Sequence, residues 1–149
     1  MNFLLPFALT TLLPCLAHTL ASAIVFNNCT DTTVYLWSVG SRIGDVQTID
    51  TGKTYSEEFR HDSQTGGISL KITTVPDGIY TSSPETDYAY SLVDDNTTVW
   101  YDISDVNGDP FANYTVALVP SSGACRGFVW ENGVSPSGTH TASCSADVD

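Results

Sequence analysis

Three aspartates spaced closely along the chain, Asp102, Asp105 and Asp109, are the first candidates for a functional site, because carboxylates bind hard cations. An EF-hand loop that began at Asp105 would need glycine at its sixth position and glutamate at its twelfth. Pro110 and Val116 occupy those positions, so an EF-hand is excluded. An irregular Ca²⁺ or Mg²⁺ site is an alternative, but Asp residues in turns commonly bond their own backbone. We therefore predict a polar acidic loop without a metal.

The sequence contains no group of residues whose types and spacing predict catalysis. His61 and His140 remain beyond the N-terminal segment, but no His-x₃-His or Cys-x₂-Cys spacing accompanies them. The sequence contains neither a Gly-x-Ser-x-Gly elbow nor a glycine-rich phosphate loop. We predict no catalytic residue, no metal ligand set and no cofactor.

The charge balance restricts the class of partner. Five Lys and Arg residues oppose 17 Asp and Glu residues, which gives a net charge of −12. Such a surface repels nucleic acid and anionic lipid, and favours neutral glycans or basic proteins. The tryptophans could stack on sugar rings, although their positions within strand patterns predict that most are core residues: Trp37, Trp100 and Trp130.

The N-terminal segment is typical of a secretory signal peptide. Residues 3–20 are almost continuously apolar, and a small-x-small pattern ends at Ala23. We predict a signal peptide over 1–23, cleavage between Ala23 and Ile24, and one mature domain over 24–149. The protein is then extracellular or held in a cell wall, with no membrane anchor.

Export gives meaning to the cysteines and the glycosylation sequons. Cys15 would leave with the signal peptide, so three cysteines remain and at most one intrachain bridge can form. The unpaired thiol is then either buried or joins two chains into a dimer. The N-glycosylation candidates are Asn96, Asn113 and Asn28.

The elements that must position these residues are predicted to be strands. Apolar and polar residues alternate over 68–73, 88–92 and 114–118, whereas 34–37 is apolar on both faces, as in a covered central strand. Turn signals recur between the runs. This spacing predicts an all-β sandwich or barrel with almost no helix.

Several motifs resemble the thaumatin-like superfold, and within it the Blastomyces yeast-phase-specific family of small secreted fungal proteins. The segments that carry the resemblance are "YLWSVG", "FRHD", "GDPF" and "VW", together with "WYDISDVNGDPF" and "ACRG". The resemblance implies a thaumatin-like β-sandwich that is reduced to its core domain.

The resemblance also bears on catalysis. Larger thaumatin-like proteins line a glucan cleft with several acids, and Asp102 matches one of them. Ala89 and Asn107 occupy two further acidic positions of that cleft. A β-1,3-glucan hydrolase, which needs two carboxyl groups, cannot be assembled from that set.

The resemblance implies a disulfide between Cys125 and Cys144, a short loop worth about 3 kcal/mol in the chain-entropy model. Cys29–Cys144 is the alternative pairing.

From these observations we expect a secreted, non-enzymatic recognition protein of a fungus that acts at the cell wall or the host interface. It would resemble an antigen or effector, with a neutral wall glycan or a host protein as its partner. The candidate binding residues are Asp102, Asp105 and Asp109. A weak glucan hydrolase and a structural wall protein linked through the odd cysteine are the alternatives.

Overall fold

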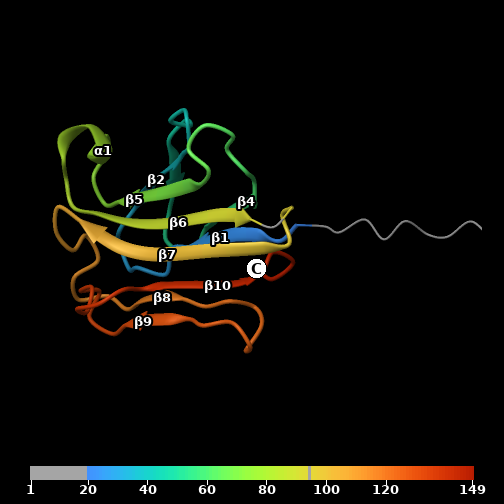
Figure 1. The fold of residues 1–149 in the computed structure, drawn as a ribbon. Coiled ribbons are helices and arrows are strands. Elements are labelled where there is room, and N and C mark those ends of the chain that lie inside the picture. The colour runs from blue at the N-terminus through green and yellow to red at the C-terminus, as the bar shows by residue number, and fades with distance from the viewer. Residues whose placement is uncertain (1–19, 94) are drawn as a thin grey trace, which may run out of the picture.

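The computed structural model describes residues 20–93 and 95–149, and strands dominate it (Figure 1). One helix of four residues, α1 (Gly78–Thr81), lies in a connection, so the all-β prediction is confirmed. No helix among the described residues is long and apolar enough to cross a membrane. The strands are β1 (Ser22–Phe26), β2 (Val34–Val39), β3 (Gln47–Ile49), β4 (Thr54–Glu58), β5 (Ile68–Thr73), β6 (Glu85–Val93), β7 (Thr98–Val106), β8 (Val116–Leu118), β9 (Phe128–Trp130) and β10 (Thr141–Ser145).

A six-stranded antiparallel sheet forms the main layer, in the order β10-β7-β6-β5-β2-β3. Its longest pairing joins β6 to β7 over nine residue pairs, from Glu85 opposite Val106 to Val93 opposite Thr98. The predicted strands over 68–73 and 88–92 correspond to β5 and to part of β6. The run over 114–118 forms a shorter strand, β8.

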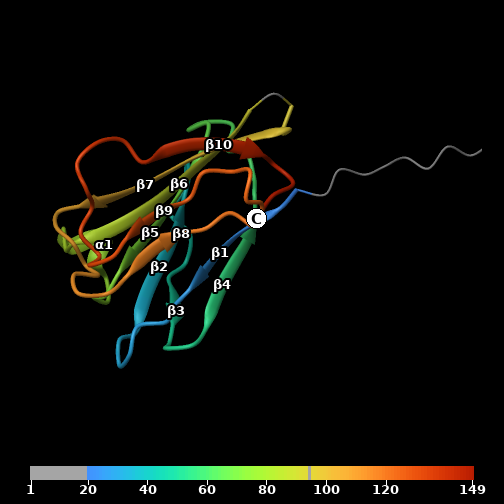
Figure 2. The same cartoon turned by 90° about the horizontal axis from the view of Figure 1, so that it is seen from below.

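The second layer consists of two separate strand pairs. β1 pairs with β4, and β8 pairs with β9, both antiparallel. In Figure 2 the two pairs lie next to each other, with β1 and β8 on the facing sides. Neither β1 nor β8 has a second hydrogen-bonded strand neighbour among the described residues, so this layer is interrupted where the main sheet is continuous.

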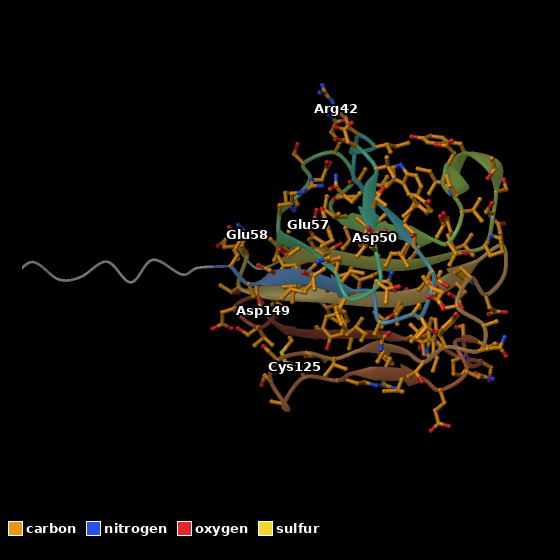
Figure 3. The ribbon with its side chains drawn as sticks, turned by 180° about the vertical axis from the view of Figure 1, so that it is seen from behind. Arg42, Asp50, Glu57, Glu58, Cys125 and Asp149 are labelled. Atoms are coloured by element: carbon orange, nitrogen blue, oxygen red, sulfur yellow. A yellow bond between two sulfur atoms is a disulfide. The ribbon has the colours of Figure 1, made fainter. Side chains whose placement is uncertain are left out.

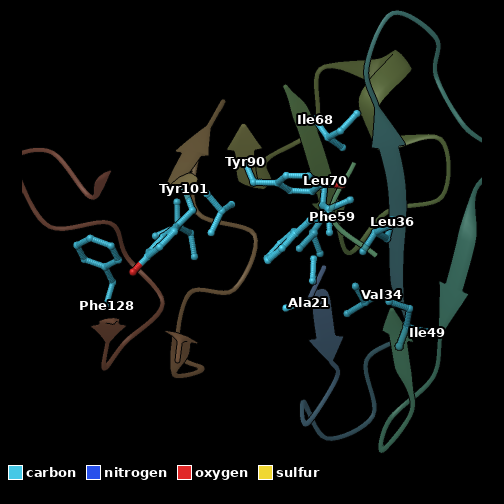
Figure 4. Packing of buried hydrophobic residues seen from close by; sticks show 14 of the residues in the cluster. Ala21, Val34, Leu36, Ile49, Phe59, Ile68, Leu70, Tyr90, Tyr101 and Phe128 are labelled. Atoms are coloured by element: carbon cyan, nitrogen blue, oxygen red, sulfur yellow. The ribbon is translucent and has the colours of Figure 1, made fainter. Parts of the chain in front are cut away.

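The core lies between the two layers (Figure 4). Because side chains alternate along a strand, every second residue of the main sheet points inward, as Leu70 and Tyr101 do. Leu36 and Leu70 are fully buried. The Phe59 ring, directly after β4, packs 4.9 Å from the Tyr90 ring of β6, which joins the β1–β4 pair to the sheet.

A carboxylate also joins the layers. Glu57 on β4 accepts hydrogen bonds from the Tyr90 hydroxyl at 2.6 Å and from the Tyr55 hydroxyl at 2.7 Å. Burial raises the pKa of Tyr55 to about 12, and the bond to the Glu57 carboxylate adds to the rise. The next residue, Glu58, points outward and lies at the margin of the molecule in Figure 3.

The described chain is structured before the predicted cleavage point. Ala21 and Ala23 are buried, and Ser22 and Ala23 pair with β4. The Ala21 amide donates to the Ala146 carbonyl at 2.9 Å, and the Ala21 carbonyl accepts from the Phe59 amide at 2.9 Å. Residues 1–19 of the predicted signal peptide lie outside the described residues, and the predicted cut falls inside β1.

Candidate functional site

The three tryptophans differ in exposure, and this difference locates the candidate site. Trp37 and Trp130 are each 2% exposed, whereas Trp100 is 49% exposed. Trp37 lies on the outward side of the main sheet, but Tyr80 of α1 covers it with a ring centroid 6.3 Å away. Of the tryptophans, only Trp100 presents its ring to a ligand.

Trp100 lies on the outer face of the main sheet, the side turned away from the core. Along β7, Tyr101 and Ile103 point inward, so Trp100 and Asp102 point outward. Ser143 of β10 and Ser91 of β6 lie opposite Trp100, on its two sides.

A shallow hollow of about 270 Å³ lies on the same face, and two of its lining residues, Ala89 and Ser91, are on the strand that pairs with β7. Ser69, Ala89 and Ser91 contribute to its lining, and such small side chains leave a depression in a sheet face. Ala89 lies directly opposite Asp102, and Ser91 directly opposite Trp100. The Ser69 hydroxyl is buried and makes no hydrogen bond with the described residues. We define the outer-face platform as Ser69, Ala89, Ser91, Trp100, Asp102 and Thr141.

Asp102 is fixed within the platform by a neighbouring strand. The Thr141 hydroxyl of β10 donates a hydrogen bond of 2.8 Å to Asp102 Oδ1. This bond orients the carboxylate and leaves its second oxygen as an acceptor. An oriented carboxylate beside an exposed indole ring can bind a hydroxyl-rich neutral ligand, because the ring offers an apolar surface and the oxygen accepts hydrogen bonds.

A second carboxylate lies near Asp102, at a position that sequence comparison did not single out. The antiparallel register makes Asp87 of β6 a diagonal neighbour of Asp102, and diagonal neighbours are about 7–8 Å apart. That separation is within the range of carboxyl pairs in glycosidases. The chemistry available to Asp87 therefore decides whether the platform can catalyse hydrolysis.

Asp87 is held in a salt bridge. Lys71 Nζ lies 2.7 Å from Asp87 Oδ2 and 2.9 Å from Glu85 Oε1. The side chains of Asp87 and Glu85 are only 14% and 9% exposed. Burial raises the pKa of Asp87, and the Lys71 ammonium opposes that rise. Asp87 thus neutralises Lys71 and stays nearly inaccessible to a ligand.

The structure separates the three aspartates of the predicted acidic loop. Asp105 is three positions after Asp102 on the same strand, so its side chain points to the opposite face. It accepts a hydrogen bond from the Thr86 hydroxyl. Burial raises the pKa of Asp105 to about 6, and the nearby Asp109 carboxyl adds to the rise. Asp105 and Asp109 form one pair, and Asp102 belongs to the outer-face platform.

The described cysteines form one bridge and leave one thiol. Cys125 and Cys144 are joined, with 5.6 Å between their Cα atoms, in agreement with the pairing that the resemblance implies. Figure 3 labels Cys125 near Asp149. Cys29 is unpaired and 6% exposed, so its thiol cannot reach another chain in this conformation.

The two histidines differ in their surroundings. His61 is exposed and His140 packs against the Phe128 and Trp130 rings. No cluster of three or more potential metal-ligating side chains occurs within the part of the chain that is described. The sequon asparagines are all exposed: Asn28, Asn96 and Asn113.

Comparison with known proteins then places the chain. The family model for the Blastomyces yeast-phase-specific protein matches residues 10–149. The chain belongs to the Blastomyces yeast-phase-specific protein family. This assignment agrees with the resemblance carried by the sequence motifs.

Two relatives of this chain bear thaumatin-like names. The chain is 38% identical over 116 residues to an antigenic thaumatin-like protein of Arthroderma benhamiae, covering 77% of this chain and 56% of the relative. It is 32% identical over 94 residues to the secreted thaumatin-like protein calA of Emericella nidulans, covering 60% and 52%. The chain thus spans about half the length of these relatives.

A solved structure supports the fold. The crystal structure of the protein elicitor MoHrip2 from Magnaporthe oryzae superposes with a TM-score of 0.66 at 31% identity. The match covers 86% of this chain and 93% of MoHrip2. A thaumatin-like β-sandwich is therefore the architecture of this family member.

Sequence reasoning missed the residues that the sheet register brings together. Lys71, Glu85 and Asp87 come from two strands, and their ion pairs depend on which strands are neighbours. The exposure of Trp100 could have been predicted from the sequence. Val99 and Tyr101, its two neighbours in β7, are buried, so alternation places the Trp100 side chain on the opposite, outward face.

Proposed function

We propose that this family member is a secreted, non-enzymatic recognition protein of a fungus, and that its outer-face platform binds a neutral glycan of the cell wall. The observation that carries the proposal is the exposed Trp100 ring beside the oriented Asp102 carboxylate, opposite two residues that line the hollow. The name of the Emericella relative supports secretion.

The physical properties of the platform favour an uncharged sugar. A sugar ring has an apolar face that packs on an indole, and hydroxyl groups that donate to a carboxylate. The net charge of −12 disfavours acidic polysaccharides. A neutral glucan or chitin chain laid across β6, β7 and β10 satisfies both conditions.

The weak hydrolase is a second candidate because Asp87 and Asp102 are diagonal neighbours. Glycoside hydrolysis needs one carboxyl that gives a proton and one that attacks or activates water. Asp87 instead forms an ion pair with Lys71 and is 14% exposed, which opposes both roles. We therefore favour binding without hydrolysis.

A binding assay separates these functions. Mature protein is incubated with insoluble β-1,3-glucan and with chitin, and both protein depletion and released reducing sugar are measured. We expect depletion without sugar release. Trp100→Ala should weaken binding about tenfold, which corresponds to about 1.4 kcal/mol and is typical of a central aromatic contact. Asp102→Asn should weaken it less.

Phe26→Ala is the matched control, because Phe26 is an exposed aromatic residue (58%) on the second layer. It should bind as the wild type does. Sugar release that Asp87→Asn and Asp102→Asn each abolish would establish the hydrolase instead. Absence of both binding and release would direct attention to a host protein, since the solved relative MoHrip2 is named a protein elicitor.

A further inference from the structure

A cavity of about 550 Å³ opens between the two halves of the second layer. β1 and β8 flank it, and within the described ranges each pairs with a single strand. Protein interiors are normally packed at crystal-like density with few voids larger than a water molecule. A space of this size is instead within the range of small-molecule binding sites, about 300–1,000 Å³.

The walls of the cavity are largely apolar and come from both layers. The main sheet contributes the side chains of Ile72, Val99 and Ile103 to the floor. β1 and β8 contribute the sides, and exposed apolar residues continue to the rim: Ile24 (58%), Phe26 (58%) and Val119 (75%). An apolar path therefore leads from the surface into the sandwich.

The main sheet also contributes a phenol side chain to the cavity wall. Tyr88 of β6 lines the cavity and is half-buried, with its ring centroid 6.1 Å from that of Tyr90. The neighbouring Tyr101 hydroxyl donates to the Arg126 carbonyl at 2.7 Å, and the Thr86 hydroxyl donates to Asp105. A tyrosine hydroxyl both donates and accepts hydrogen bonds, so Tyr88 offers the cavity a polar group for a ligand that carries a hydroxyl.

The charge at the cavity selects against anions. Asp149 is the only charged residue in the lining of the described cavity, and its carboxylate accepts a 2.6 Å hydrogen bond from the Ser22 amide. No lysine or arginine lines the cavity to neutralise an acidic headgroup. A fatty acid carboxylate would therefore meet a negative charge without a compensating cation.

We propose that this cavity binds one neutral lipid, an elongated hydrophobic molecule with a single hydroxyl group such as a sterol, which hydrogen-bonds to Tyr88. The site is in the sandwich interior, on the other side of the main sheet from the outer-face platform. It is thus independent of the proposed glycan binding.

The test uses dehydroergosterol, a fluorescent neutral sterol, and cis-parinaric acid, a fluorescent anionic fatty acid, titrated with the folded protein at pH 7. We expect saturable binding of one dehydroergosterol per chain, and binding of cis-parinaric acid at least tenfold weaker. Tyr88→Phe keeps the ring and removes the hydroxyl, and should weaken sterol binding about fivefold. Val116→Trp fills the cavity from β8 and should abolish binding.

Two controls keep the outcome interpretable. Val129→Trp adds the same bulk on β9, but Val129 is 59% exposed and does not line the cavity, so sterol binding should be unchanged. Trp100→Ala should also leave it unchanged, which separates this site from the platform. Thermal unfolding of each variant identifies any that fail to fold.

The proposal is wrong if dehydroergosterol does not bind, if cis-parinaric acid binds as tightly, or if both cavity variants bind as the wild type does. It is also wrong if the protein forms dimers in which the amides of β1 and β8 become protected from hydrogen exchange. That result would assign the opening to a strand of a second copy.

Discussion

The two layers of the sandwich are built differently from similar residues. The main sheet has six strands in continuous antiparallel pairing, with Lys71 and its two carboxylates adding ion pairs across β5 and β6. The second layer has two short pairs with an apolar cavity between them. From this difference we infer that the main sheet contributes most of the free energy of unfolding and carries the outer-face platform. The second layer contributes the opening of the apolar cavity.

Replacing one leucine by alanine in each layer is the strongest test of this difference in stability. Leu70→Ala in β5 should cost about 3 kcal/mol of unfolding free energy, because Leu70 is fully buried. Leu118→Ala in β8 should cost about 1 kcal/mol, because Leu118 is half-buried and borders space that already exists. Urea unfolding of both variants measures the two losses. Equal losses would contradict the division between layers.

The disulfide joins the two regions, because Cys144 is on β10 of the main sheet and Cys125 is in the β8–β9 connection. Removing it with Cys125→Ala and Cys144→Ala together should cost about 2–3 kcal/mol. We expect faster hydrogen exchange in β8 and β9, with β5 and β6 much less affected. A uniform increase over all strands would show that the layers unfold as one unit.

The residues at the start of β1 test how much the second layer depends on its N-terminal hydrogen bonds. A chain that begins at Ile24 loses the backbone bonds of Ala21 to Ala146 and Phe59, and the bond of Ser22 to Asp149. We expect such a chain to be about 2 kcal/mol less stable than one that begins at His18, at about 1 kcal/mol for each hydrogen bond less some fraying.

Because a chain that begins at Ile24 would be less stable, we expect the secreted protein to keep Ala21. Cys15 and Ala17 form a second small-x-small pattern, so signal peptidase could also cleave after Ala17. Mass spectrometry of the secreted chain identifies its first residue. An N-terminus at Ile24 would support the cut predicted from the small-x-small pattern.

A smaller effect is expected at Asp105, which lies at the end of the main sheet. Its folded pKa of about 6 lies above the unfolded value near 3.8, so the folded state binds the proton more tightly. Its contribution to stability is present below about pH 4 and is lost as the pH rises to about 6.

The loss should be about 1 kcal/mol after allowance for solvent screening, and Asp105→Asn should remove it while keeping an acceptor for Thr86. Urea unfolding from pH 4 to pH 7 compares the two proteins. Identical pH profiles would show that Asp105 titrates normally.

The smallest expected effect concerns Cys29. Because its thiol is buried, and burial raises its pKa, alkylation of the folded protein should be slow at pH 8. A gel without reductant should show a monomer. A reductant-sensitive dimer that Cys29→Ser abolishes would instead support the structural wall protein linked through this residue.

Two strands of the main sheet, β5 and β6, were predictable because their side chains alternate. Ile68, Leu70 and Ile72 alternate with polar residues and form β5, at the predicted position. The same period of two separates Asp102 from Asp105, although closeness in sequence grouped them. That separation was readable from the sequence once 98–106 was recognised as a strand.

The cavity and the Lys71 ion pairs were not predictable in this way. Both depend on which strands become neighbours, and alternation within one strand does not specify its partner. The apolar pattern of Val116 and Leu118 shows that they face inward, but not that the space beside them stays open. Chain order alone does not reveal that β1 and β8 end up on either side of one opening.

The bond between Ala21 and Ala146 has a consequence for how the protein is made. It joins positions 125 residues apart, and β1 contacts Asp149 as well. During vectorial synthesis or export, β1 therefore emerges first but cannot complete its contacts until nearly the whole chain has followed. The second layer is expected to close late, after the local hairpin of β6 and β7, and the apolar strand β1 must stay unaggregated in the interval.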